Sequence, residues 1–322
     1  MGGPSGLVAL GMMTAALAAC GEAHAAPPRP RPVAATAAAS GHACRRPAET
    51  GTSTLTLRAG GRVRVARLHV PRGYPTDRAL PLVLNLHGSG STAAVQEAAS
   101  QLDRTADAHG FLVVYPQGAR KSGTGFSWNI PGTPAWQAGG ADEADYLRQL
   151  VTLVSGRYCA DARRIYATGF SGGAREVSEL ACAPERVFAA VAAVGGLRAP
   201  APCAAGPVPV LAIHGTADPQ NPYDGHGQAY WTYSVPDAAR RWAQHDGCAA
   251  APTVDTVPGA TLTAYGRCQS SGAVELYTLP GKGHAWPADR PGAFGANEAI
   301  WRFFVDHPLP RHGGPARPPK ST

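Results

Sequence analysis

The stretch Ile165-Tyr166-Ala167-Thr168-Gly169-Phe170-Ser171-Gly172-Gly173-Ala174-Arg175 begins as an apolar strand and continues as a helix, with one serine at the turn. The spacing Gly169-x-Ser171-x-Gly173 has a steric cause. A strand that turns sharply into a helix brings backbone into contact on both sides of the apex, where a Cβ would clash. Such a turn holds the Ser171 hydroxyl exposed above a sheet. The pattern is short and the chain has 39 glycines, so the surrounding sequence must support the interpretation.

A second strand-to-loop transition lies upstream. The apolar run 82–86 has the length of a strand and is followed by His87-Gly88-Ser89-Gly90-Ser91 and then by a helical pattern over 92–109. A Gly-rich loop at a strand end can present backbone N–H groups. In α/β-hydrolases such a loop supplies one oxyanion donor and the residue after the nucleophile supplies the other. We therefore predict an oxyanion hole formed by the amides of Ser89 and Gly172.

Two further strand ends supply an acid and a base. The buried run 208–213 is followed by His214 and Asp218, and the run 275–279 leads into a Gly-rich loop that contains His284. Serine is a poor nucleophile at neutral pH, so a base must take its proton and a carboxylate must orient that base. The residues Ser171, Asp218 and His284 predict this arrangement, in that chain order.

Competing interpretations exist for each of these residues. Ser171 could be an ordinary loop serine, and Asp224 is a rival to Asp218 as the orienting acid. His284 is the histidine that follows the last predicted strand in a Gly-rich loop. The other histidines are expected either to stabilise loops or to lie elsewhere: His87, His214, His226, His245 and His307.

The order of elements predicts one α/β domain. Residues 62–70 alternate between polar and apolar, as in an antiparallel strand exposed on one face, whereas the later strands are continuously apolar. Helical patterns separate the strands, at 92–109, 142–158, from 171 onward, 236–245 and 297–305. Alternation of this kind predicts a mostly parallel sheet with helices on both faces. No segment has the pattern of a large lid domain.

The same motifs resemble a known family of secreted esterases. It includes poly(3-hydroxybutyrate) depolymerase-like proteins, LpqC-like lipoproteins, and the feruloyl and acetylxylan esterases of carbohydrate esterase family 1. The matching pieces run in order from about residue 44 to 305: LNLHGSGST, YPQG, SWN, ADEADYL, YCADARRIYATGFSGGA, ELAC, FAAVAAVGG, PVPVLAIHGTADPQNPYDG, HDGC and GKGHAWP. The resemblance implies an α/β-hydrolase fold and ester hydrolysis. Two departures are the pair Asp142-Glu143 before a helix and the glycine at position 172, where relatives often carry a larger residue.

The N-terminus has the pattern of an export signal. Residues 7–19 are apolar but too short to span a bilayer, and Leu17-Ala18-Ala19-Cys20 resembles a lipobox. We predict a signal peptide over 1–19, lipidation of Cys20, a linker over 20–43, a catalytic domain over 44–307 and a tail over 308–322. The alternative is ordinary cleavage after Ala23-His24-Ala25, which would release a soluble protein.

Cysteine usage fits export to an oxidising compartment. Six cysteines remain beyond Cys20, and we expect Cys248 to pair with Cys268 across a Pro-, Thr- and Gly-rich excursion. The other four allow three pairings, of which we favour Cys182 with Cys203 and Cys44 with Cys159. The cysteine spacing does not predict a metal site.

Charge does not indicate a nucleic-acid partner. The formal net charge is +7, of which residues 1–49 carry +2 and the tail after Asp306 carries +3, so the core keeps only +2. We expect a monomer that acts on a small-molecule, polysaccharide or polyester substrate and needs no cofactor. Any membrane attachment would run through Cys20.

Aromatic residues on two loops are candidates for substrate contacts. Residues 116–140 contain Trp128, the segment after Asp218 contains Tyr223, and Trp286 follows His284. Each could equally cover the core. The sequence thus predicts a serine esterase with an acyl-enzyme mechanism. The alternatives are a peptidase or acyltransferase on the same fold, or a non-catalytic, lipid-anchored binding protein.

Overall fold

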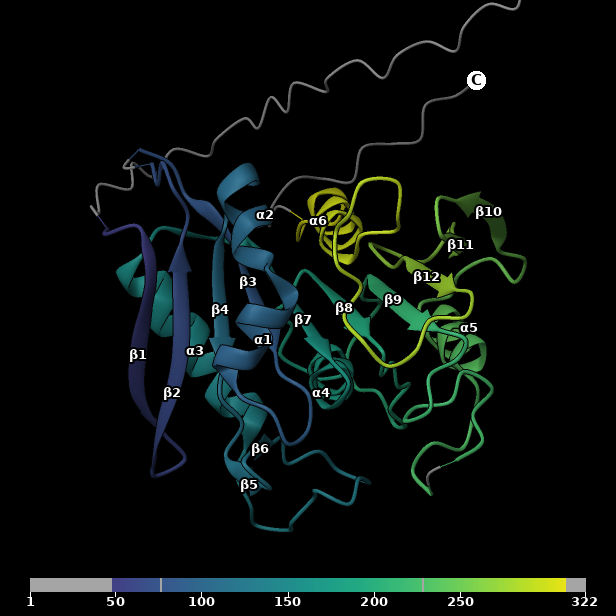
Figure 1. The fold of residues 1–322 in the computed structure, drawn as a ribbon, viewed down its shortest axis with the longest axis horizontal. Coiled ribbons are helices and arrows are strands. Elements are labelled where there is room, and N and C mark those ends of the chain that lie inside the picture. Colours follow the sequence, from purple (N-terminus) through teal and green to yellow (C-terminus); the bar gives the residue numbers. More distant parts are fainter. Residues whose placement is uncertain (1–47, 76, 228, 311–322) are drawn as a thin grey trace, which may run out of the picture. The chain divides into compact units, whose positions relative to one another are not determined.

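The computed structural model of the chain describes residues 48–75, 77–227 and 229–310. They build a ten-stranded sheet with the order β1-β2-β4-β3-β7-β8-β9-β12-β11-β10 (Figure 1). The strands are β1 (Gly51–Ala59), β2 (Arg62–Val70), β3 (Leu80–Leu86), β4 (Leu112–Pro116), β7 (Ala160–Phe170), β8 (Ala190–Val194), β9 (Val210–Gly215), β10 (Thr253–Val257), β11 (Ala260–Tyr265) and β12 (Val274–Leu279). A separate hairpin pairs β5 (Arg120–Ser122) with β6 (Gly125–Ser127).

The six central strands are parallel. Each neighbouring pair from β4 through β3, β7, β8 and β9 to β12 runs in the same direction, and antiparallel strands flank them at both edges. Parallel strands covered on both faces need apolar residues at successive positions, and all seven residues of β3 are buried. The carboxyl ends of the six strands therefore meet at one edge of the sheet.

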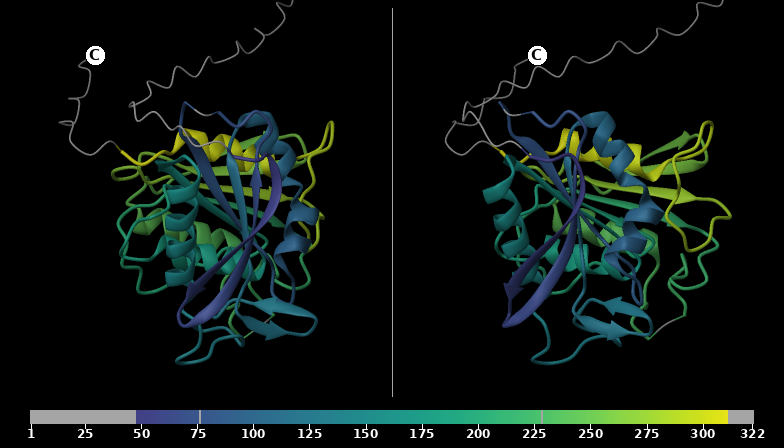
Figure 2. Two further views of the ribbon diagram at one scale, coloured as in Figure 1. Left: turned by 90° about the vertical axis from the view of Figure 1, so that its left-hand side faces the viewer. Right: turned by 60° about the vertical axis from the view of Figure 1, so that its left-hand side comes forward.

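Helices cover both faces of the sheet, as Figure 2 shows. On one face, α1 (Ala93–Ser100), α2 (Leu102–His109) and α6 (Ala296–Asp306) bury residues such as Ala106, Ile300 and Phe303. On the other face, α3 (Glu143–Arg157), α4 (Gly172–Ala181) and α5 (Val235–His245) bury residues such as Tyr146, Val177 and Trp242. This mostly parallel sheet with helices on both faces confirms the fold class predicted from the sequence.

The prediction of one continuous helix over 92–109 is wrong, because the structure has two helices there. The stretch predicted as 92–109 is divided into α1 and α2 at Gln101, whose φ is 54°. The Gln101 N–H donates to Glu97 O and ends α1 in a left-handed turn, and α2 starts at the next residue. Hydrophobic periodicity continues across this break, so the pattern alone does not reveal it.

Several strands lie in segments predicted as irregular. The β10–β11 hairpin lies within the excursion between Cys248 and Cys268, and β5–β6 lies within the loop 116–140. Strand β10 has no buried residue. Edge strands gain their stability from pairing with a neighbour more than from a buried face. Their sequences therefore need not alternate between apolar and polar residues, which is the pattern that predicts a strand.

Two predicted disulfides are confirmed. Cys182–Cys203 joins the end of α4 to the segment before β9, and Cys248–Cys268 links the two ends of the segment that carries β10 and β11. Cys159 is disulfide-bonded as well. The predicted partner Cys44 lies outside the described residues, as do Cys20, the predicted signal peptide and linker, and the tail from residue 311.

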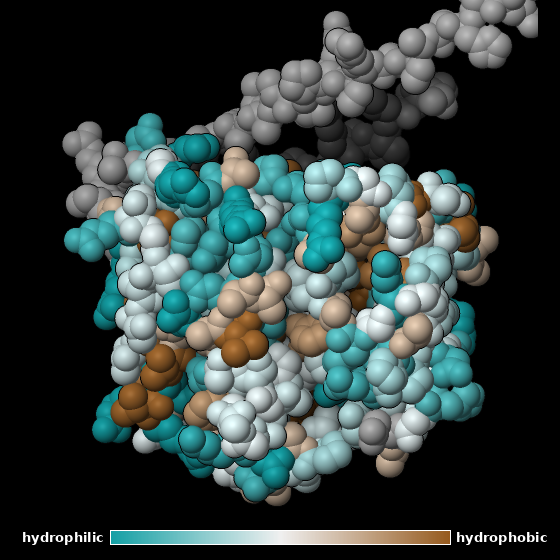
Figure 3. Space-filling view, in the orientation of Figure 1, coloured by the Kyte–Doolittle hydropathy of each residue, from teal (hydrophilic) through white to brown (hydrophobic). Residues whose placement is uncertain are grey.

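Hydrophilic residues dominate the face drawn in Figure 3, with small separate hydrophobic patches between them. Val63 and Val65 of β2 are among the exposed apolar side chains. Of the helices that the structure describes, none is both long and apolar enough to cross a bilayer.

The strand-to-helix turn at Ser171 depends on very close backbone packing. A Cβ on Gly169 would lie 2.5 Å from the Gly173 carbonyl carbon, and a Cβ on Gly173 would overlap Leu86 O and lie 2.7 Å from His87 O. These neighbours are backbone atoms that cannot rotate away. The two glycines therefore allow α4 to start directly against the end of β3, as the Gly169-x-Ser171-x-Gly173 spacing predicted.

We predict that Gly173→Ala lowers the free energy of unfolding by about 1–3 kcal/mol, because the added methyl group must displace the end of β3. Urea denaturation measures the change. The matched control is Gly156→Ala in α3, where a Cβ meets nothing within 4 Å. This control should raise the stability by up to about 1 kcal/mol. Equal stability changes in the two variants would contradict the close-packing argument.

Candidate active site

Ser171 lies at the apex of the turn between β7 and α4. Its backbone adopts φ 52° and ψ −109°, a conformation that costs a non-glycine residue on the order of 1–3 kcal/mol. Its N–H donates to Val194 O at 2.9 Å, and its carbonyl accepts from Arg175 N at 3.1 Å. The residue is 8% exposed. A strained turn held from both sides keeps the hydroxyl at the carboxyl edge of the sheet.

Asp218 and His284 come together from neighbouring parallel strands. Asp218 follows β9, His284 follows β12, and His284 Nδ1 lies 2.6 Å from Asp218 Oδ2. The other carboxylate oxygen accepts the backbone N–H groups of Gln220 and Asn221, each at 2.8 Å. His214 Nε2 lies 3.3 Å from Asp218 Oδ2. The carboxylate is thus surrounded by donors.

These donors set the charge state of the pair. Burial by itself raises the pKa of Asp218, but hydrogen bonds from His214, His284 and the Asn221 amide outweigh burial and hold that pKa well below its usual value. An ionised carboxylate can only accept, so His284 Nδ1 carries the proton and donates it. The described residues make no hydrogen bond to Nε2 of His284, which is left free to accept a proton.

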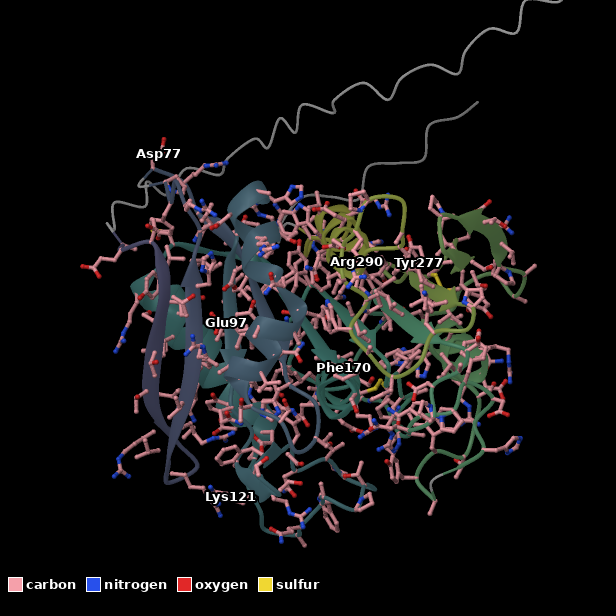
Figure 4. The ribbon with its side chains drawn as sticks, viewed as in Figure 1. Asp77, Glu97, Lys121, Phe170, Tyr277 and Arg290 are labelled. Atoms are coloured by element: carbon pink, nitrogen blue, oxygen red, sulfur yellow. A yellow bond between two sulfur atoms is a disulfide. The ribbon has the colours of Figure 1, made fainter. Side chains whose placement is uncertain are left out.

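The imidazole of His284 packs against the residue that precedes the serine. Its ring and that of Phe170 have centroids 4.7 Å apart, and its Cε1 and Nδ1 lie 3.5 Å from the position of a Cβ on Gly195. Phe170, labelled in Figure 4, is the last residue of β7 and directly precedes Ser171. No hydrogen bond joins Ser171 Oγ to His284 among the described residues. Catalytic hydrogen bonds of this kind often tighten only when substrate is in place.

The loop after β3 lies against residue 172. A Cβ on Gly172 would overlap Ser89 Oγ and lie 2.9 Å from Ser89 N. Glycine at this position therefore permits the two predicted oxyanion amides to lie side by side.

His87 stabilises that loop from inside the core. Its Nδ1 donates to Gly88 O at 2.8 Å, its Nε2 accepts from Gly118 N at 3.0 Å, and Trp128 Nε1 donates to His87 O at 2.8 Å. The fully buried imidazole must be neutral to donate through Nδ1 and accept through Nε2, and burial lowers its pKa to about 4. His87 thus holds the Ser89 amide in place without touching the reacting groups.

A cleft of about 470 Å³ opens in front of Ser171 and Ser89. The rest of its lining comes from the β5–β6 region, α4 and the loop after β9: Arg120, Ser122, Ser127, Trp128, Ile130, Thr133, Pro134, Ala135, Arg175, Pro219, Gln220, Asn221 and Tyr230. Most of these side chains are polar or small. Of the three aromatic residues predicted to contact substrate, only Trp128 lies in this lining.

Tyr223 and Trp286, which the sequence analysis offered as substrate contacts, do not line this cleft. The Tyr223 hydroxyl lies 2.7 Å from Thr278 Oγ1. Trp286 is buried against α6, where its Nε1 donates to Asn297 Oδ1 at 2.9 Å. A buried indole needs an acceptor, and α6 supplies one that cannot be foreseen from the loop sequence.

Arg175 and Asn221 are cleft residues that the sequence analysis did not single out. The detectable signal for Arg175 is its place in the first turn of α4, directly after the serine turn. Asn221 connects two loops of the site. Its Nδ2 donates to Gly195 O at 2.6 Å, and its backbone N–H donates to Asp218 Oδ1. No sequence pattern indicates this double role.

The rival residues lie in other surroundings. Asp224 accepts the backbone N–H of His226, His245 contacts Asp246, and His307 Nδ1 bonds Phe303 O. None of these histidines bonds Asp218. Of the predicted acid and base, the structure places Asp218 and His284 in direct contact, and the catalytic roles of these two residues and of Ser171 remain a prediction.

Comparison with known proteins agrees with this fold and with an esterase. The family model described as "Esterase PHB depolymerase" matches residues 65–259. The putative esterase NocK of Nocardia uniformis subsp. tsuyamanensis is 32% identical, over 91% of this chain and 93% of its own length. Poly(3-hydroxyalkanoate) depolymerase C of Paucimonas lemoignei is 31% identical over 71% of this chain, but that match spans only 60% of the depolymerase.

A solved structure, the acetyl xylan esterase from Aspergillus awamori, superimposes with a TM-score of 0.58 at 16% identity, covering 79% of this chain and 99% of that one. This likeness concerns the fold alone. The protein is a carboxylic ester hydrolase with the α/β-hydrolase fold. Within that class, it belongs to the esterase PHB depolymerase family.

The neutral state of His87 predicts a pH dependence of stability. The unfolded chain protonates this histidine near pH 6.5, whereas the folded protein resists protonation down to about pH 4. Stability should therefore fall as the pH drops through this interval, by about 2–3 kcal/mol between pH 7 and pH 4.5 from this group alone.

Urea denaturation of the wild type and of His87→Gln across this range tests the prediction. Glutamine does not titrate, so its stability should fall less steeply with acidification even if it starts lower. Parallel curves for the two proteins would show that His87 does not exclude the proton.

Proposed function

We propose that the protein is an exported serine esterase in which Ser171, His284 and Asp218 form the catalytic triad. The observation that carries this proposal is the 2.6 Å contact between His284 Nδ1 and Asp218 Oδ2, beside a strained serine at a Gly-flanked turn. An ionised carboxylate that fixes the tautomer of a histidine leaves Nε2 to act as a general base.

The chemistry would proceed in two halves. Ser171 Oγ attacks the ester carbonyl carbon while His284 Nε2 takes the hydroxyl proton, and the resulting oxyanion accepts hydrogen bonds from the Ser89 and Gly172 amides. The carbon–oxygen bond to the alcohol then breaks, and the alcohol leaves with the proton held by His284. Water attacks the acyl-enzyme in the same manner, releases the acid and restores the serine.

The composition of the cleft supports small ester substrates with polar groups. Esters of feruloyl or acetyl polysaccharides and short hydroxyalkanoate oligomers all fit the family resemblance. Serine, threonine, glutamine and arginine side chains dominate the walls. Such groups can bind hydroxyl and carbonyl oxygens. No step of the proposed chemistry requires a cofactor.

Export is proposed from the sequence and supported by the disulfides. Bonds such as Cys182–Cys203 persist in oxidising compartments and are rare in the cytosol. Attachment to the outer face of the membrane would run through a lipid on Cys20. Its test is metabolic labelling with a radioactive fatty acid, which the wild type should incorporate and Cys20→Ala should not.

We predict that a fluorophosphonate probe labels the wild type and that Ser171→Ala abolishes both labelling and hydrolysis of nitrophenyl butyrate, with a rate loss of at least about 10³-fold. The matched control is Ser155→Ala in α3, whose hydroxyl has no hydrogen-bond partner. It should keep both properties. A wild type that is never labelled would favour a binding protein, and equal cleavage of matched amides would favour a peptidase.

We predict that Gly172→Ala lowers kcat by about 10²-fold or more, because its methyl group displaces the Ser89 amide from the oxyanion hole. Steady-state kinetics on nitrophenyl butyrate give the change, with Gly156→Ala as the matched glycine control. Unchanged kcat in a folded Gly172→Ala protein would place the oxyanion donors elsewhere.

The preferred acyl group can be tested directly. A panel of methyl ferulate, acetylated xylan and 3-hydroxybutyrate oligomers, with Ser171→Ala as the blank, measures relative kcat/KM values.

A further inference from the structure

Arg175 is a buried cation in the wall of the cleft that holds Ser171. It lies in α4, four residues after Ser171, and is 6% exposed. Both residues line the same cleft. The guanidinium and the proposed nucleophile therefore face the same space.

The guanidinium of Arg175 forms no ion pair with any described carboxylate, although Asp218 acts on its charge at longer range. Its Nη1 donates to Asn221 Oδ1 at 3.0 Å, which is a neutral amide, and its Cζ lies 5.2 Å from the centroid of the Tyr230 ring. Its Nε is buried without a hydrogen-bond partner. No described Asp or Glu oxygen lies within 4 Å of the guanidinium. The other buried arginine of the described residues, Arg64, pairs with Glu143.

A buried guanidinium without a carboxylate is energetically costly. Burial lowers the pKa of Arg175, although an arginine stays charged at any ordinary pH. A buried charge without a partner is typical of a functional site, where a bound ligand supplies the opposite charge. The position of Arg175 beside the serine indicates that such a ligand would be the substrate.

The remainder of the cleft has the same sign of charge. Its ionisable lining residues are Arg175 and Arg120, and the lining contains no aspartate or glutamate. Arg120 Nη1 bonds only the carbonyl of Pro134, at 3.1 Å. Two cations without an acid create a potential that attracts anions.

We propose that the substrate is an ester that carries a separate carboxylate, and that Arg175 binds this carboxylate while Ser171 attacks the ester. This inference rests on the proposed esterase function and narrows its substrate class. Arginine suits the task because its planar fork can donate two parallel hydrogen bonds to one carboxylate.

The carboxylate could belong to either half of the ester. Hydroxyalkanoate oligomers have a free carboxylate at one end, on the alcohol side of the terminal ester bond. Monoesters of dicarboxylic acids have one on the acyl side. Methyl ferulate and acetylated neutral sugars have none. The charge therefore favours acidic esters over neutral ones.

Two substrate pairs test the proposal on the full-length protein. The acyl-side pair is the mono-nitrophenyl ester of glutaric acid and nitrophenyl pentanoate. The alcohol-side pair is the 3-hydroxybutyrate dimer and its N-methylamide, which has no charge. The ratio of kcat/KM within each pair measures the preference for the carboxylate, for the wild type, Arg175→Gln, Arg175→Lys and the control Arg240→Gln.

We expect the wild type to prefer the acidic member of at least one pair by about tenfold or more. Arg175→Gln should bring that ratio close to one, mainly through a higher KM for the acidic substrate, and Arg175→Lys should restore part of it. Arg240 is an exposed residue of α5 that pairs with Asp237 and does not line the cleft, so Arg240→Gln should keep the wild-type ratio.

Arg175 also donates a hydrogen bond to Asn221, which in turn holds the Asp218 loop. The experiment must therefore distinguish a purely structural role of Arg175 from a role in binding the carboxylate. A structural role lowers kcat/KM equally for both members of a pair and leaves the ratio unchanged. That result, or a wild type with no preference in either pair, would overturn the proposal. The wild-type ratio stands even if Arg175→Gln fails to fold. Failure of the wild type to hydrolyse any ester would instead overturn the proposed function.

Discussion

The whole site depends on the close contact between the start of α4 and the end of β3. Gly173 lies against the carbonyl groups of Leu86 and His87, at distances that leave no room for a side chain. This contact determines where Ser171 lies relative to the loop that carries Ser89. Because both segments are backbone held by the sheet, the proposed nucleophile and oxyanion donors are positioned by the fold itself. Their geometry therefore does not rely on flexible side chains.

The acid and the base obey a different constraint. Asp218 and His284 follow β9 and β12, which are adjacent parallel strands, so their loops emerge side by side at the same edge. Electrostatics then completes the arrangement. A nearly unexposed carboxylate remains ionised because His214, His284 and backbone amides all donate to it. The same donors keep His284 in one orientation beside Phe170, which leaves its second nitrogen available for chemistry.

The cleft follows from loops that the sheet does not constrain. Its walls come from the β5–β6 region, α4 and the segment after Asp218. Arg175 differs from the cleft residues on loops, because it lies in α4, the helix that follows the serine turn. A charge on such a helix can orient a substrate more reliably than one on a loop. The residue proposed to select the substrate and the proposed nucleophile thus lie on α4 and on the turn directly before it.

Sequence reasoning succeeded where a local rule has a steric or topological cause. The Gly169-x-Ser171-x-Gly173 spacing and the apolar parallel strands predicted the turn and the sheet. The shared catalytic role of Ser171, Asp218 and His284 remains a prediction, supported by the contact between Asp218 and His284. Sequence reasoning failed where tertiary contacts decide. Trp286 belongs to the core because Asn297 of α6, outside the loop that carries the tryptophan, offers an acceptor. Arg175 is informative only once the structure shows that no acid faces it, and the break at Gln101 has no periodic signal.

The most direct test of the account is a crystal structure of the protein after reaction with a phosphonate ester inhibitor. The account predicts a covalent bond from Ser171 Oγ to phosphorus. It also predicts that the phosphoryl oxygen lies about 2.7–3.1 Å from the backbone nitrogens of Ser89 and Gly172, with His284 Nε2 facing the serine oxygen. Phosphorus bonded to another residue, or a phosphoryl oxygen that faces away from both amides, would contradict it.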